Sequence, residues 1–248
     1  MRKKTEDSSK KRMKKRIAKK ILTICMILIF IVISLYVFLT KNKTSDITYK
    51  ENGNTDYNIS ISENEFFKDS ILSANNQYIS SIINKVNIKF KYNLSFSDTH
   101  LDSKYKYRIE STTKVIEKNT QNNLYTFDET LKEEEEEKVQ NGKINIDNEM
   151  AIDYQKYDAM IKKLISTYEL SNINCKTVVT LYVDLLDKNG NVRDTSKMSI
   201  NIPLNVKTVN IETESSFSNT DEKLYEKGKT RKGIWLFLII AVLLTYLE

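Results

Sequence analysis

The only histidine of the chain, His100, lies in the polar run from Ser97 to Asp102. Histidine is the usual general base of a Ser-His-Asp triad, because its side chain exchanges a proton near neutral pH. A triad would require this run to meet a serine elsewhere, and no serine stands in a motif that exposes a nucleophile. We therefore interpret His100 as a solvated loop residue without a catalytic role.

A Ser-Lys dyad is the second nucleophilic arrangement that the sequence permits, since serine and lysine are both common. In such a dyad the lysine must give up its proton to act as a base, which requires a special environment. No spacing singles out a pair. We predict that the chain is not an enzyme and name no catalytic residue, with a Ser-Lys envelope hydrolase as the alternative.

Two cysteines occur, Cys25 in an apolar segment and Cys175 in a pattern typical of a strand. A lone cysteine on the apolar face of a strand behaves as a small hydrophobic residue and is usually unreactive. With a single cysteine after the apolar segment, no disulfide can form within the following domain.

Five consecutive glutamates, Glu133–Glu137, lie between Lys132 and Lys138. Carboxylates bind Ca²⁺, but consecutive side chains point in different directions and do not converge on one ion. We interpret this run as solvated and mobile. Because the sequence also has no phosphate-binding glycine loop and no metal-spaced Cys or His cluster, we predict no metal, no cofactor and no small-molecule substrate.

The positive charge of the chain is concentrated at one end. Residues 1–20 contain 11 Lys or Arg against Glu6 and Asp7, whereas residues 41–232 have a slight acidic excess. A domain with no surplus of positive charge cannot neutralise phosphates, so we exclude nucleic acid as a partner. The basic residues are instead typical of a cytoplasmic tail that lies against anionic lipid.

The segment Ile21–Leu39 contains 19 residues without a charge. As a helix it would extend about 28 Å, which matches the hydrocarbon thickness of a bilayer. It is longer than the apolar region of a cleaved signal peptide and has no small-residue cleavage site. We predict an uncleaved transmembrane helix over 21–40, with residues 1–20 in the cytoplasm and the rest outside the cell membrane.

A second charge-free segment, Ile234–Leu247, would extend only about 21 Å as a helix. The lysines and arginine just before it oppose the positive-inside rule unless the first anchor has fixed the orientation. We expect a second transmembrane helix over 233–248 that is cut short at Glu248. An interfacial or partner-packed helix with Trp235 at the headgroup level is the alternative.

Alternating apolar residues predict strands between the two hydrophobic segments. Residues Asp187–Asn191 separate two of these strands, and the Asn189-Gly190 pair predicts a hairpin turn with positive φ angles. The clearest strand is Val86–Phe96, and the others are Tyr105–Ile109, Leu124–Leu131, Cys175–Leu185, Met198–Leu204 and Val206–Ile211.

Apolar residues at spacings of three and four predict one helix over Tyr154–Tyr168, with Asp153 as its N-cap. A shorter helix is predicted around Gln77–Asn84. We therefore predict a mostly β fold, an antiparallel β-sandwich with one packed helix, and a closed barrel as the alternative architecture. The predicted organisation is a cytoplasmic tail (1–20), a transmembrane helix (21–40), a stalk (41–56), the exported domain (57–215), a charged linker (216–232) and a second hydrophobic helix (233–248).

The order of several segments resembles the domain of unknown function 5305 family of bacteria and archaea. The resemblance rests on the N-terminal anchor, Asn64–Tyr78, Ile152–Tyr157, Ile200–Leu204 and the second hydrophobic segment, and it covers roughly residues 57–247. The family has no assigned activity or catalytic residues. The resemblance implies an accessory or structural envelope protein that accompanies signal peptidase or surface-fibre systems.

From the sequence we expect a membrane-anchored, non-enzymatic protein whose exported domain binds a partner protein or another copy of itself. A sensor that signals inward is a weaker alternative, because the 20-residue tail is too short for a signalling domain.

Overall fold

The computed structural model describes residues 46–74 and 76–227, together with residues 13, 14, 16–18, 20–22, 24, 25 and 32. The compact unit Thr48–Tyr225, here called the β domain, contains both large sheets. Among the described residues, no helix is both long enough and apolar enough to cross a membrane. The predicted transmembrane segment 21–40 lies mostly outside the described residues, and the segment 233–248 lies entirely outside them.

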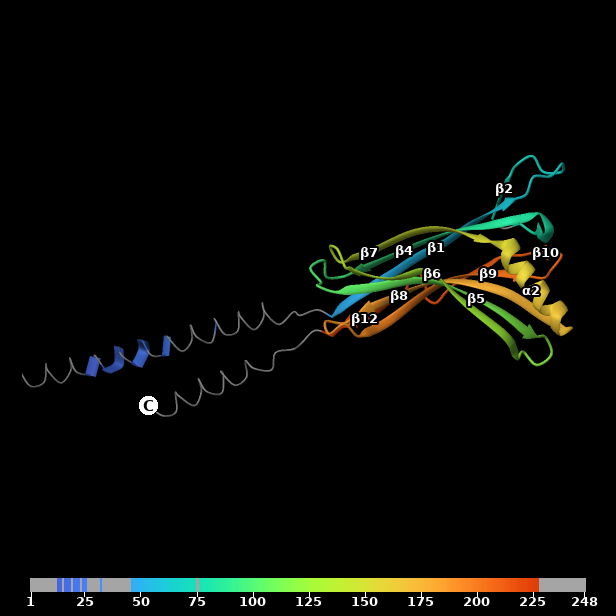
Figure 1. The fold of residues 1–248 in the computed structure, drawn as a ribbon. Helices are drawn as coiled ribbons and strands as arrows, with labels where there is room; N and C mark the ends of the chain where they lie inside the picture. Colours follow the sequence, from blue (N-terminus) through green and yellow to red (C-terminus); the bar gives the residue numbers. More distant parts are fainter. Residues whose placement is uncertain are drawn as a thin grey trace, which may run out of the picture. The chain divides into compact units, whose positions relative to one another are not determined.

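Two large antiparallel sheets form the two layers of the β domain (Figure 1), which confirms the predicted mostly β fold and is consistent with a β-sandwich. The first sheet has the order β12-β1-β4-β7, with β2 paired to β1. Its strands are β1 (Ile47–Ile61), β2 (Ile71–Ser73), β4 (Ile83–Phe96), β7 (Lys143–Asp153) and β12 (Glu222–Glu226).

The second sheet has the order β11-β9-β8-β5-β6. Its strands are β5 (Lys104–Glu117), β6 (Asn123–Lys138), β8 (Ile173–Leu186), β9 (Val192–Leu204) and β11 (Glu212–Ser215). The predicted strands in this region are confirmed, but β6 is longer than the predicted Leu124–Leu131. It forms an edge of the sheet, and its side chains are mostly exposed.

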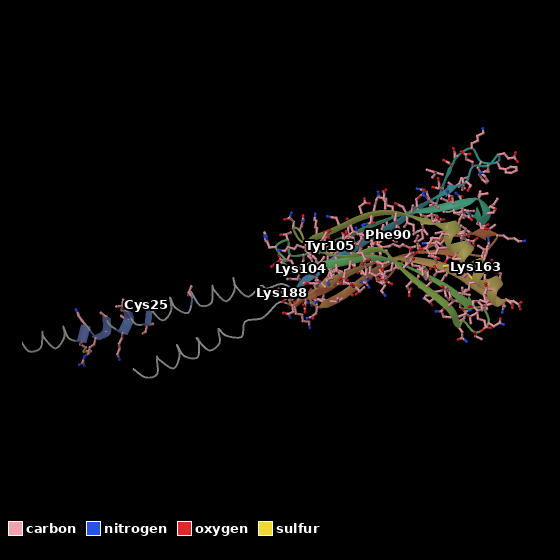
Figure 2. All side chains as sticks on the ribbon, viewed as in Figure 1. Cys25, Phe90, Lys104, Tyr105, Lys163 and Lys188 are labelled. Atoms are coloured by element: carbon pink, nitrogen blue, oxygen red, sulfur yellow. The ribbon has the colours of Figure 1, made fainter. Side chains whose placement is uncertain are left out.

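The core lies between the inner faces of the two sheets. In β4, every second residue from Val86 to Phe96 is buried, and the labelled Phe90 (Figure 2) has no exposed surface. The sheets approach closely at Gly53 of β1, where a Cβ atom would lie only 2.7 Å from the sulfur of Met198 in β9. This alternation confirms the period-two interpretation of Val86–Phe96.

The helix α2 (Tyr154–Tyr168) connects β7 of the first sheet to β8 of the second. The carboxylate of Asp153 accepts a hydrogen bond from the backbone N–H of Lys156 at 3.0 Å, which confirms the predicted N-cap. Asp158, which is 3% exposed, accepts from the backbone N–H of Asn205 at 2.7 Å and so ties the helix to the end of β9. The helix therefore packs between the sheets near one end of the domain (Figure 1).

Short elements close the same end of the domain. β3 (Tyr78–Ile79) pairs with β10 (Thr208–Val209), and a single turn of 3₁₀ helix, η1 (Ser80–Ile82), follows β3. The helix predicted around Gln77–Asn84 is wrong except for this single turn. The residues before the turn belong to β3, and those after it belong to β4. The predicted strand Val206–Ile211 is reduced to the two residues of β10.

The predicted hairpin between β8 and β9 is present, but it is held differently. The carboxylate of Asp187 accepts hydrogen bonds from the backbone N–H groups of Asn189 and Asn191 at 2.8 and 2.9 Å. Gly190 has a φ of +83°, whereas Asn189 is not among the residues with positive φ. The Asp187 side chain therefore fixes the turn that the Asn189-Gly190 pair predicted.

Two predicted segment boundaries are wrong. The stalk predicted over 41–56 is strand from Ile47 onward, and the linker predicted over 216–232 contains β12. Their polar composition is explained by position, because alternate residues of β1 form the solvent-facing side of the first sheet. The folded unit therefore extends over more residues, Thr48–Tyr225, than the predicted 57–215.

The glutamate run Glu133–Glu137 was predicted to be mobile, and this is wrong, because it forms the last part of β6. Alternate glutamates pair with alternate residues of β5. Tyr107 donates to Glu135 at 2.5 Å, and Lys106 donates to Glu134 at 2.8 Å. The period of two thus sends neighbouring carboxylates to opposite faces of the sheet, where tyrosine and lysine side chains receive them.

Candidate functional site

His100 and Cys175, which were singled out from the sequence for their reactive side chains, lie on different elements. His100 is exposed in the loop between β4 and β5, and its backbone N–H donates to the carboxylate of Asp98 at 2.9 Å. Cys175 is 2% exposed on β8, and burial raises the pKa of its thiol to about 11. A thiol with this pKa stays protonated at neutral pH, as expected for an unreactive core residue.

A buried polar group, which we call the Glu51 cluster, lies at the other end of the domain from α2. It joins four strands from the two sheets, since Tyr49 and Glu51 are on β1, Tyr92 is on β4, Asp194 and Ser196 are on β9, and Lys223 is on β12. The carboxylate of Glu51 is only 2% exposed. A buried charge is unfavourable unless it is paired or hydrogen-bonded, so the partners of Glu51 decide whether the site is stable.

Each oxygen of Glu51 has a different kind of partner. Oε1 accepts hydrogen bonds from the hydroxyl of Tyr92 at 2.8 Å and from the hydroxyl of Ser196. The Nζ of Lys223 lies 2.8 Å from Oε2, which accepts no hydrogen bond of regular geometry in the described part of the chain. The ammonium of Lys223 therefore provides the main compensation for burying Oε2.

Asp194 extends the cluster toward solvent. It accepts a hydrogen bond from the hydroxyl of Tyr49, and its Oδ2 lies 3.5 Å from the Nζ of Lys223. Lys223 thus stands between two carboxylates. Burial works against its charge, but the adjacent carboxylates of Glu51 and Asp194 outweigh this effect and raise the pKa of Lys223 above its usual value.

This arrangement brings a serine and a lysine close together, as the alternative hydrolase interpretation requires, but it opposes nucleophilic chemistry. Ser196 is 2% exposed, and its hydroxyl is directed to Glu51. A catalytic lysine must lose its proton near neutral pH, whereas Lys223 has a raised pKa. The Glu51 cluster therefore acts as a structural clamp that holds β12 and β9 to β1.

Aromatic rings complete the clamp at the end where β1 begins. The rings of Tyr49, Phe96 and Tyr225 form a group with centroid distances of 5.0–6.4 Å. The hydroxyl of Tyr225 donates to the backbone oxygen of Leu186 at 2.7 Å. Tyr225 of β12 is thereby fixed beside Tyr49 of β1, so the first and last strands of the domain are held together.

The titration of the cluster predicts loss of stability at both pH extremes. Burial opposes the charge of Asp194, but Tyr49 and Lys223 outweigh it and lower its pKa. A lowered pKa means that stability is present above the unfolded value of about 3.9 and is lost as the pH falls through the folded value. Burial, with Glu51, raises the pKa of Tyr92. The stability from Tyr92 and Lys223 is present below about pH 10 and is lost as the pH rises further.

Urea titrations of the full chain from pH 3 to pH 11 test this dependence. We expect the urea midpoint to be highest between about pH 5 and 9 and to fall on both sides. The variant Asp194→Asn should flatten the acid limb, with Asp147→Asn on the outer face of β7 as the matched control. An acid limb as steep in Asp194→Asn as in the wild type would contradict the assignment.

The cluster residues could not be recognised from the sequence, because Tyr49, Glu51 and Lys223 lie in segments with a polar composition. One signal was available. Every second residue from Tyr49 to Ile61 forms the series Tyr, Glu, Gly, Thr, Tyr, Ile and Ile. This is the pattern of a strand, interrupted by the inward-facing Glu51 and Gly53.

Comparison of the chain with protein-family models, with curated proteins and with solved structures finds no match. The resemblance to the domain of unknown function 5305 family therefore stays a prediction.

Proposed function

We propose that the chain is a membrane-anchored, non-enzymatic envelope protein whose β domain lies outside the cell membrane and binds a partner protein. The basic residues 1–20 and the charge-free segment Ile21–Leu39 support cytoplasmic and transmembrane assignments, respectively. The residues described between 13 and 32 are helical, and their apolar side chains, including Ile21, Leu22 and Val32, are exposed. Exposed apolar side chains on a helix suit a lipid environment.

The observation that carries the proposal is the pairing of the first strand of the β domain with the last. β1 and β12 are neighbours in the first sheet. Tyr49 contacts Tyr225 and Glu51 contacts Lys223, so the chain runs along the two strands in opposite directions. The chain therefore enters and leaves the domain at the same end. This geometry suits a domain whose two flanking hydrophobic segments, 21–40 and 233–248, are inserted in one bilayer. The proposal therefore includes a short C-terminal hydrophobic helix over 233–248.

The polar chemistry of the domain favours a binding role over a catalytic one. The Glu51 cluster is buried and internally paired, while the outer face of the first sheet carries rows of asparagine, lysine and carboxylate side chains. By the family resemblance, the partner belongs to a signal peptidase or surface-fibre system, and association with another copy of the chain is the alternative.

Crosslinking on intact cells tests the binding role. A membrane-impermeant, lysine-reactive crosslinker reaches exposed side chains of the β domain such as Lys50 and Lys91. We expect a discrete product of higher mass than the chain alone. A chain that stays unlinked would contradict the proposal. A serine-directed covalent probe that labels the chain, with Ser196→Ala removing the label, would favour the hydrolase.

A further inference from the structure

The loop between β1 and β2, residues 62–70, carries the most exposed large hydrophobic side chain in the described part of the chain. Phe66 is 84% exposed, and its neighbour Phe67 is 39% exposed. Ile71, which begins β2, is 57% exposed. We call residues 62–70 the tip loop. Adjacent exposed aromatic residues are unusual on a soluble surface and typically mark an interaction site.

The tip loop is held in a defined shape. The side-chain oxygen of Asn64 accepts hydrogen bonds from the backbone N–H groups of Phe66 and Phe67 at 3.0 and 2.9 Å. At its base, the N–H of Ile61 donates to the oxygen of Ser70 at 2.9 Å. The two rings are therefore presented by a preformed turn, which reduces the entropy lost on binding.

A hollow is formed by the tip loop itself together with the end of β1. It has a volume of about 410 Å³ and is lined by Ile61, Phe67 and Lys68 among others. Phe67 thus lines a concave region of the loop, while its neighbour Phe66 is the more exposed of the two rings. A paired knob and hollow is typical of the centre of a protein–protein interface.

The tip loop lies at the end of the β domain opposite the end where the chain enters and leaves, so a partner can reach it from that far end. β1 has 15 residues and begins where the chain enters the domain, so its far end lies about 45 Å away. Figure 1 shows β2 at the end opposite β12, and in Figure 2 Lys188 and Lys163 mark these two ends.

The charges around the rings decide which partner fits. Glu63, Glu65 and Asp69 outnumber Lys68, so the tip loop has a net charge of −2. An anionic lipid surface attracts basic residues and would repel this loop. A second copy of the same loop would place like charges opposite each other. An apolar pocket with a rim of lysine or arginine satisfies both the rings and the carboxylates.

We propose that the tip loop binds a partner protein by inserting Phe66 into an apolar pocket whose rim is basic. The inference rests on the proposed function, because it names the surface and the partner chemistry for that binding role. The acidic rim orients the partner, while burial of the aromatic rings provides most of the affinity.

Site-specific photocrosslinking of the full chain in intact cells tests this inference. The photoreactive residue p-benzoylphenylalanine replaces Phe66 in one variant and Val192, which is 56% exposed at the other end of the domain, in the control. We expect a protein adduct from position 66 only. Adding Phe67→Ser should lower its yield about tenfold, and Glu65→Lys should lower it and remove its sensitivity to salt. The crosslinked peptide, sequenced by mass spectrometry, should contain apolar residues with Lys or Arg.

Other outcomes overturn the inference in recognisable ways. An adduct with a second copy of the chain or with lipid shows a different occupant. An adduct from position 192 but not 66, or one that is insensitive to Phe67→Ser and Glu65→Lys, leaves the binding role intact and removes the tip loop from it. No adduct from either position, together with no product from the lysine-reactive crosslinker, contradicts the proposed function itself. An unchanged melting temperature in each variant confirms that folding is preserved.

Discussion

Lys223→Met is expected to lower the free energy of unfolding of the β domain by about 2 kcal/mol. Breaking a fully buried ion pair costs about 3–5 kcal/mol. The effect here is smaller, because the side chain of Lys223 is 36% exposed and solvent screens its charge. The loss arises mainly from Glu51, which is 2% exposed and would keep a buried carboxylate without its counter-ion.

A double-mutant cycle measures this coupling. Glu51→Gln removes the charge but keeps an oxygen to accept from Tyr92 and Ser196, so adding it to Lys223→Met should recover about half of the loss. Lys91→Met on the outer face of β4 is the matched control and should change the stability by less than about 0.5 kcal/mol. Urea unfolding of the full chain in detergent, followed by circular dichroism, gives each value. Simple additivity of the two substitutions would show that the clamp does not act as an ion pair.

Gly142→Ala is expected to lower the free energy of unfolding by about 3 kcal/mol. Gly142 connects β6 to β7 with a φ of +68°, which alone disfavours a side chain. A Cβ atom there would also lie 2.7 Å from the backbone oxygen of Asp98 and 2.9 Å from the Cα of Thr99. Backbone atoms cannot move aside as a flexible side chain can, so the loop between β4 and β5 would be displaced.

Gly190→Ala separates the two causes. Gly190 also has a positive φ, of +83°, but a Cβ atom would meet no atom within 4 Å. This control should therefore cost only about 1 kcal/mol, from the backbone conformation. The same urea measurement compares them, and equal losses in the two variants would mean that the close approach of Asp98 and Thr99 to Gly142 contributes nothing.

Elements with a regular apolar period were predictable from the sequence. The strand Val86–Phe96 and the helix Tyr154–Tyr168 follow periods of 2 and 3.6 without interruption, and both are present at nearly the predicted bounds. Even within α2 the pattern overstates burial, since Tyr168 is 68% exposed at the last turn. Periodicity predicts an element and its general face, whereas the contacts at its ends depend on the tertiary structure.

The segments that were not predicted share a different physical cause. β1 presents Glu51 and Gly53 to the interior, where apolar residues are expected, because Lys223 neutralises one and the side chains of Met198 and Phe217 occupy the space above the other. The end of β6 accommodates the run Glu133–Glu137, because tyrosines and lysines of β5 pair with Glu134–Glu137. In both strands, residues far away in the sequence make an unfavourable local composition acceptable.

Thiol labelling of intact cells is the most direct test of the central claim, that the β domain is anchored and lies outside the membrane. In a Cys25→Ala and Cys175→Ala background, Asn189→Cys places a thiol in the exposed β8–β9 hairpin, and Ser8→Cys places one in the basic tail. With a membrane-impermeant maleimide, we predict labelling at position 189 in intact cells and labelling at position 8 only after lysis. Protection of position 189 until lysis would contradict the account.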